Sequence, residues 1–163
     1  MYFEDEERRN RAMEVWQQAY EHQMQGELDQ AVELYLESLA IFPTAEAHTF
    51  LGWIYSSQER LDEAIQECQK AIAVDPDFGN PYNDIGVYLM QKGDLEGAIP
   101  WLEKAKLAPR YEPRHYPYMN LGRIHLQRHQ WHEALREIQA GVHIAPSNLE
   151  MRNMLHELLA KFN

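Results

Sequence analysis

The sequence of 163 residues lacks features that several classes of protein require. Its single cysteine, Cys68, cannot form a disulfide within the chain, which is typical of a reducing compartment. No stretch of about 18 apolar residues is present, so the sequence predicts no membrane-spanning helix. Residues 1–5 have neither the basic region nor the apolar core of a signal peptide. We therefore expect a cytoplasmic protein that has no membrane partner.

Basic runs are also scarce. The chain has 26 Asp and Glu against 15 Lys and Arg, which gives a formal net charge of −11. The densest basic cluster, residues 8–11, follows the acidic residues 4–7 at a spacing that allows ion pairs along one helix. Because a nucleic-acid-binding domain needs a basic face, we expect no nucleic-acid partner.

The sequence motifs of common catalytic sites are missing as well. There is no glycine-rich phosphate loop, no G-x-S-x-G nucleophile elbow and no H-E-x-x-H zinc motif. The many carboxylates are scattered as solubility alone would require. The sequence predicts a protein that is not an enzyme and that binds no cofactor.

What the sequence does have is an internal repeat of about 34 residues. Alanine recurs at positions 31, 64, 98 and 134, with spacings of 33, 34 and 36 residues. A small residue stands twelve positions before each of them, at Ala19, Gly52, Gly86 and Gly122, and proline follows each copy. Small residues allow two helices to approach closely, and proline ends a helix. Each copy therefore predicts a helix–turn–helix unit that must stack on its neighbours to bury its apolar face.

The second copy reads His48-x2-Leu51-Gly52-x2-Tyr55, then Ala64-x3-Cys68, then Pro76. This closely resembles the tetratricopeptide repeat, whose pattern is W-x2-L-G-x2-Y…A-x3-F…P. The resemblance covers about residues 12–148 and implies an all-α fold, a right-handed superhelical stack forming one domain over 1–163. The expected repeats are about 12–44, 45–78, 79–112 and 115–148, with a capping helix over 148–161. An ordinary helical bundle with chance spacing is the alternative.

Two segments depart from the regular pattern. The link at residues 109–114 is two residues longer than the other links, and we predict a fixed loop there. The capping helix follows a capping box, Ser147-x2-Glu150. Its predicted inward-facing residues are Leu149, Leu155, Leu158, Leu159 and Phe162. This apolar helix leaves open a self-associating structural subunit, and hence a possible homo-oligomer.

The resemblance also implies that the first helix of each unit lines a concave groove. The groove residues that we expect to contact a partner are Trp16, Tyr20, Thr49, Trp53, Asn83, Val87, Met90, Met119 and Arg123. Because other residues fill the core positions, this apolar stripe indicates a partner site. A tightly curled superhelix, or a register shifted by one residue, would instead explain it without a partner.

The aromatic and charged residues along the groove predict the chemical groups of its ligand. Trp16, Tyr20 and Trp53 should form one aromatic patch, and Arg123 at the other end should bind an acidic group, with Asn83 or Asn120 as helpers. One subgroup of the family grips a C-terminal carboxylate with lysine and arginine at defined groove positions. Those cations are missing here, and Asp84 would repel a carboxylate.

The sequence thus predicts a scaffold that binds a peptide or a helical segment of a protein partner. A metal site or an enzyme built on histidines is the remaining alternative. His125 and His129 are one helical turn apart, a spacing that suits a metal ion, and His132 follows. However, His125 occupies the tyrosine position of the repeat, where its ring would pack in the core. We therefore predict no metal.

Overall fold

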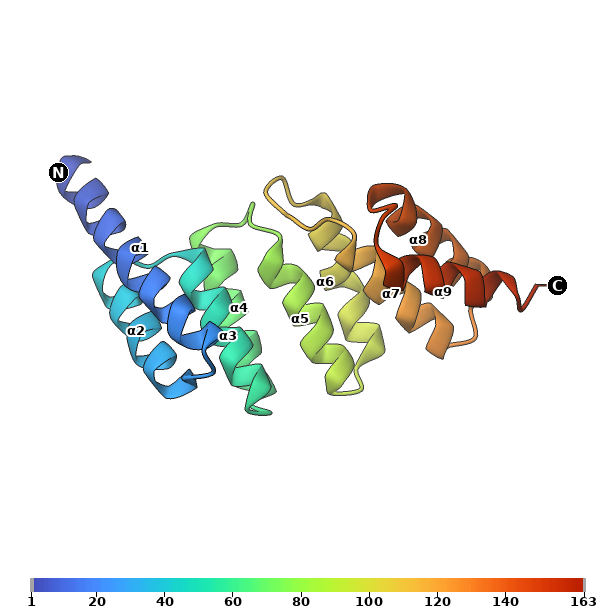
Figure 1. The fold of residues 1–163 in the computed structure, drawn as a ribbon, viewed down its shortest axis with the longest axis horizontal. Helices are drawn as coiled ribbons and strands as arrows, with labels where there is room; N and C mark the ends of the chain where they lie inside the picture. The colour runs from blue at the N-terminus through green and yellow to red at the C-terminus, as the bar shows by residue number, and fades with distance from the viewer. Residues whose placement is uncertain (1, 163) are drawn as a thin grey trace.

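The computed structural model describes residues 2–162, and these residues form nine α-helices joined by short links (Figure 1). The helices are α1 (Tyr2–Met24), α2 (Leu28–Ile41), α3 (Ala45–Ser57), α4 (Leu61–Val74), α5 (Asn80–Gln91), α6 (Leu95–Leu107), α7 (Tyr116–Gln127), α8 (Trp131–Ile144) and α9 (Leu149–Leu159). The all-α stack of paired helices that the sequence predicted is confirmed. None of the helices in residues 2–162 is long and apolar enough to cross a bilayer.

Helices pair within each unit because small residues stand where the two axes approach. A Cβ added at Gly52 would lie 3.0 Å from the carbonyl oxygen of Ala64, and one at Gly86 would lie 2.5 Å from the Leu102 side chain. Ala64 is fully buried at the same contact. The alanine and glycine positions of the sequence repeat are therefore the points at which the paired helices touch.

The turn inside every unit has the same left-handed conformation. Gly26 and Gly93 have φ angles of 81° and 84°, and the equivalent residues Glu59 and His129 have φ angles of 62° and 57°. Glycine adopts this region at no steric cost, whereas a residue with a Cβ does so at a cost of about 1–2 kcal/mol. The repeat thus fixes the turn even where the sequence carries no glycine to mark it.

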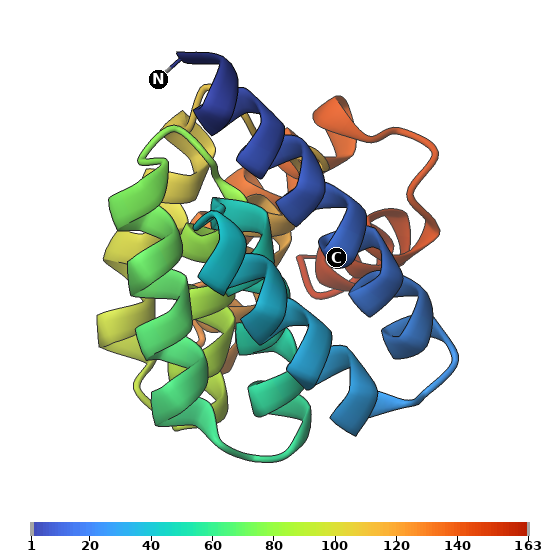
Figure 2. The same ribbon diagram turned by 90° about the vertical axis from the view of Figure 1, so that its left-hand side faces the viewer.

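The units stack along one direction, with the two ends of the chain at opposite ends of the stack (Figure 1). Figure 2 looks along this direction from the N-terminal end. Each second helix packs on the first helix of the next unit, and α5 additionally contacts both α3 and α7. The first helices are therefore the ones drawn together, which places them on the inner, concave side of the curve.

The core runs along the stack as a series of small apolar clusters rather than one central mass. Tyr35 and Leu51 are fully buried between the first two units, and Leu102 and Leu121 between the last two. Cys68 is fully buried, as the sequence predicted, and burial raises the pKa of its thiol well above the usual value. This cysteine is a small apolar core residue and not a nucleophile.

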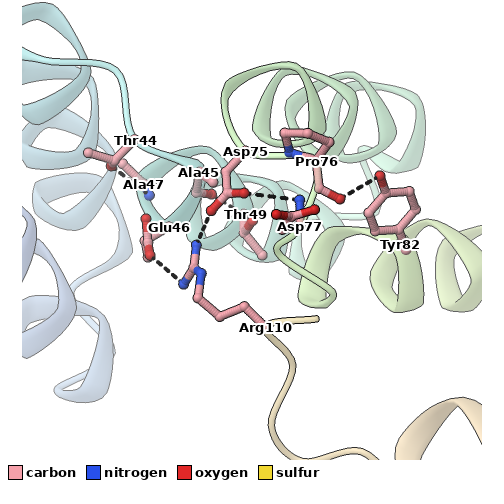
Figure 3. Close-up of polar contacts among 10 residues, drawn as sticks. All are labelled: Thr44, Ala45, Glu46, Ala47, Thr49, Asp75, Pro76, Asp77, Tyr82 and Arg110. Atoms are coloured by element: carbon pink, nitrogen blue, oxygen red, sulfur yellow. Dashed lines mark hydrogen bonds and ion pairs between the residues drawn. The ribbon is translucent and has the colours of Figure 1, made fainter. Parts of the chain in front are cut away.

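The long link between α6 and α7 folds back onto the second unit (Figure 3). The guanidinium of Arg110 pairs with Glu46 of α3 at 3.0 Å and with Asp75 at 2.5 Å. It also lies 4.3 Å above the ring centroid of Phe78. The hydrogen bond from Arg110 lowers the pKa of Asp75. The fixed loop predicted from the sequence is thus held by contacts with a unit that lies earlier in the chain.

Backbone hydrogen bonds reinforce this contact. The amide of Arg110 donates to the carbonyl of Asp77 at 3.0 Å, and the amide of Gly79 donates to the carbonyl of Arg110 at 2.9 Å. Gly79 has no room for a side chain here, because a Cβ would lie 2.5 Å from Cγ of Tyr111. The link and the α4–α5 turn therefore form one short parallel bridge at the edge of the stack.

The last helix differs from the sequence prediction in its cap and its buried face. Asn148, not Ser147, caps α9, because its side-chain oxygen accepts a hydrogen bond from the Met151 amide at 2.9 Å. Met151 and Leu158 are the helix's buried residues. Three residues predicted to face inward are instead exposed, namely Leu149, Leu159 and Phe162. The helix still covers α8, as a capping helix must.

Candidate functional site

The predicted groove residues lie on the first helices of the four units. Trp16 and Tyr20 come from α1, Thr49 and Trp53 from α3, Asn83, Val87 and Met90 from α5, and Met119 and Arg123 from α7. The stripe was expected to be exposed, and most of it is not. Trp53 is the exposed member, with 52% of its surface accessible.

Thr49, Asn83 and Met119 are buried, which corrects the sequence expectation. The hydroxyl of Thr49 donates back to the Ala45 carbonyl at 2.7 Å within its own helix. Met119 packs with the core residues that join α7, α8 and α9. Val87 and Met90 are partly buried against core clusters as well. The middle of the stripe is therefore shared between the groove and the core, because the curve of the stack brings the first helices together.

Aromatic rings gather at the N-terminal end of the groove. Trp16 stacks on Tyr20 with 5.7 Å between ring centroids, and both rings meet Phe50 edge-on, at 5.3 and 5.5 Å. Within residues 2–162, no ring contact joins Trp53 to this trio. The predicted patch of Trp16, Tyr20 and Trp53 therefore does not form as expected. Trp16 and Tyr20 pack with Phe50 instead, and Trp53 lies apart from them and is exposed to solvent.

A chain of amide hydrogen bonds crosses the C-terminal half of the concave face. The side chain of Asn120 donates from Nδ2 to Oδ1 of Asn83 at 3.0 Å and accepts from Nη1 of Arg123 at 3.1 Å. Arg123 also forms an ion pair with Glu150 of α9. Arg123 is therefore not the free cation that the sequence predicted for an acidic ligand group, since a carboxylate of the same chain already holds it.

Asp84 is the groove residue whose role the sequence did not reveal. It lines a pocket of about 300 Å³ between α5, α7 and the 108–115 link, together with Asn80, Asn83, Val87, Tyr111, Pro113, Tyr116, Met119, Asn120 and Arg123. Its hydrogen bond with Nδ2 of Asn83 is long, at 3.5 Å. Burial raises the pKa of Asp84 to about 7, and the Asn83 hydrogen bond opposes this only weakly. The carboxyl group therefore keeps its proton to a higher pH than an ordinary aspartate does.

The three histidines proposed as an alternative metal site are each engaged separately. Nδ1 of His125 lies 2.8 Å from the side-chain oxygen of Gln130, the ring of His129 contacts Trp131, and the ring of His132 contacts Phe162. In the part of the chain that the structure describes, no group of three His, Cys, Asp or Glu residues is arranged to hold a metal ion.

Comparison with known proteins places these features in a class. Residues 45–78 and 80–109 each match a family model described as the tetratricopeptide repeat. Among solved structures, pilF of Pseudomonas aeruginosa is similar over 96% of this chain and 70% of its own, with a TM-score of 0.85 and 23% sequence identity. YrrB, described as a TPR protein with an unusual peptide-binding site, is similar over 92% of this chain and 77% of its own, with a TM-score of 0.68 and 20% identity.

One curated relative matches over part of the chain. A Caenorhabditis elegans cell division cycle protein 27 homolog is 33% identical over 101 residues, which are 61% of this chain and 12% of that protein. This chain therefore corresponds to a small part of that relative. Helix pairs stacked in this way define the α-helical repeat proteins, whose fold suggests a scaffold for protein–protein interaction. Within that class, this chain contains tetratricopeptide repeats, at residues 45–78 and 80–109.

Proposed function

We propose that this protein is a non-catalytic scaffold that holds a peptide or a helical segment of a partner protein against its concave face. The observation that carries the proposal is Trp53, a large aromatic side chain that is half exposed on the inner side of the stack. An exposed tryptophan is the kind of anchor at which protein interfaces concentrate their binding energy. The peptide-binding site described for YrrB supports the same use of this fold.

Changing Trp53 to alanine should weaken ligand binding by more than tenfold. Truncating a central aromatic anchor commonly costs about 2 kcal/mol or more of binding free energy. The probe is a set of random twelve-residue peptides selected on the wild-type protein, whose dissociation constants are then measured by fluorescence anisotropy. Because Trp53 is exposed, its loss should leave the helical circular dichroism signal intact.

A control is Leu107→Ala, which removes an apolar side chain that is 83% accessible from α6, outside the groove. This variant should bind the selected peptides as the wild type does. Normal binding by the Trp53 variant would instead move the functional face to the convex side or to α9. If the wild-type protein retains no peptide, the scaffold proposal itself is wrong.

Self-association is a second candidate function, which exposed apolar residues at the C-terminal end favour. Leu149 is 68% accessible and Phe162 is 44% accessible. These two side chains offer apolar surface to a second copy of the chain at the C-terminal end of the stack. Sedimentation at several protein concentrations separates the two functions, because a scaffold for other proteins remains a monomer, whereas a self-associating subunit does not.

A further inference from the structure

We infer that the pocket between α5, α7 and the 108–115 link receives a cationic side chain of the bound segment, the ammonium of lysine or the guanidinium of arginine, and that Asp84 recognises it. This inference rests on the proposed function, because it assigns the chemistry of one position of the ligand. It also replaces the acidic ligand group that the sequence predicted, since the carboxylate that is free in the groove belongs to the protein.

The first argument is the lack of a partner for Asp84. Within residues 2–162, no lysine, arginine or histidine nitrogen lies within 4.0 Å of its carboxylate, although the chain forms many other ion pairs. Its contact with Asn83 is a long hydrogen bond at 3.5 Å. A partly buried carboxylate that has lost water without gaining a cation is unfavourable unless it is protonated or a ligand supplies the charge.

The second argument concerns the groups that face Asp84. Cys68, Tyr88 and Tyr111 surround it, and burial raises the pKa of each of these groups, so all three are neutral near pH 7. Glu67 of α4 lies near Cys68 but is occupied by His48 and Lys70. None of Cys68, Tyr88, Tyr111 and Glu67 therefore offers Asp84 a positive charge that would neutralise it.

The third argument is that the nearest cation is already committed. Arg123 lines the same pocket, but its guanidinium pairs with Glu150 and donates to Asn120. Asn120 in turn holds Asn83, whose amide points toward Asp84. These contacts hold Arg123 with Asn120 and Glu150, and in residues 2–162 no ion pair joins Arg123 to Asp84.

The walls of the pocket suit the stem of a long basic side chain. Lysine and arginine bury their methylene groups on apolar surface while the charged head seeks a polar partner. Val87, Pro113 and Met119 supply apolar surface, and Tyr116, which is 40% exposed, presents a ring that attracts cations. The net charge of −11 additionally raises the local concentration of any cationic ligand.

The test uses n-butylammonium, which reproduces the end of a lysine side chain, and n-propylguanidinium, which reproduces that of arginine. Each is titrated at pH 8 into the isotope-labelled protein while the amide resonances of Asn83, Asp84 and Val87 are followed. We expect saturable shifts for at least one of the two cations and none for 1-butanol. Asp84→Asn should raise the dissociation constant at least tenfold.

The control is Asp29→Asn, which removes the same charge from an exposed site on α2 and should bind the cation as the wild type does. Lowering the pH from 8 to 6 should weaken binding by about tenfold in the wild type, because protonation of Asp84 competes with the cation. Equal binding by the Asp84 variant, or no saturable shift with either cation, overturns the inference.

The peptides selected on the wild-type protein separate this failure from that of the proposed function. Peptides that bind through Trp53 but show no enrichment of lysine or arginine would overturn the cation site and leave the scaffold intact. Saturable binding of a cation without any retained peptide would support the site and overturn the scaffold.

Discussion

Replacing Ala64 with arginine should lower the free energy of unfolding by about 3 kcal/mol or more. Ala64 is fully buried where α4 meets α3, and its carbonyl oxygen lies only 3.0 Å from the place where a Cβ of Gly52 would stand. Glu67, the acid at this contact, is already held by His48 and Lys70, so a guanidinium must either remain buried without a free partner or force the two helices apart. Urea denaturation followed by circular dichroism measures the loss.

The matched control is Gln66→Arg, which introduces the same side chain at an exposed position of the same helix. Surface substitutions of this kind usually change stability by no more than about 0.5 kcal/mol. Two variants of equal stability would show that Ala64 does not lie at the helix contact, and the assignment of the repeat would then fail.

Replacing Asp84 with asparagine should stabilise the protein at pH 8 by about 2–4 kcal/mol and change little at pH 4. Burial raises the pKa of Asp84 from its ordinary 3.8 to about 7, so between these values the folded state holds a proton that the unfolded state has released. Stability contributed by this group therefore falls as the pH rises from about 4 to about 7. Because asparagine cannot ionise, the variant should not lose this stability as the pH rises.

The measurement is the free energy of unfolding at several pH values between 5 and 8, with Asp29→Asn as the control. The wild type and the control should show parallel curves, while the Asp84 variant should diverge upward with increasing pH. Glu67 acts in the opposite direction. Although burial alone would raise its pKa, hydrogen bonds from His48 and Lys70 lower it overall, so its contribution is lost at acidic pH. Parallel curves for all three proteins would show that Asp84 is well solvated.

Helices could be predicted closely because their signals are local. Thr44 and Asp94 cap α3 and α6 within three residues of the amides they bind, and the alanines at the helix contacts recur with the period of the repeat. The cap of α9 was misplaced by one residue, because Ser147 and Asn148 are adjacent and both residue types cap helices well. Capping propensity alone does not show which of two adjacent residues is the N-cap of a helix.

The groove was predicted less well because its character depends on distant pairs. Arg123 was expected to be free, but Glu150 is 27 residues away in sequence and reaches it only after α9 folds over α8. Asn83 and Asn120 are 37 residues apart in sequence, and both are buried where their side chains form a hydrogen bond. The sequence placed Asp84 in the groove as a carboxylate, but that it lacks an ionic partner follows only when these contacts are known.

The fold of the 108–115 link adds contacts on which the stability of the second unit depends. In a stack of repeats, each unit normally contacts only its immediate neighbours, and the stability of the array is a sum over adjacent pairs. Here Arg110, which follows the third unit, binds Glu46 at the start of the second unit and Asp75 at its end. The stability of the second unit therefore depends in part on the link that leads into the fourth unit. A chain that ends before residue 108 would lose its fourth unit and also the ion pairs that Arg110 forms with its second unit.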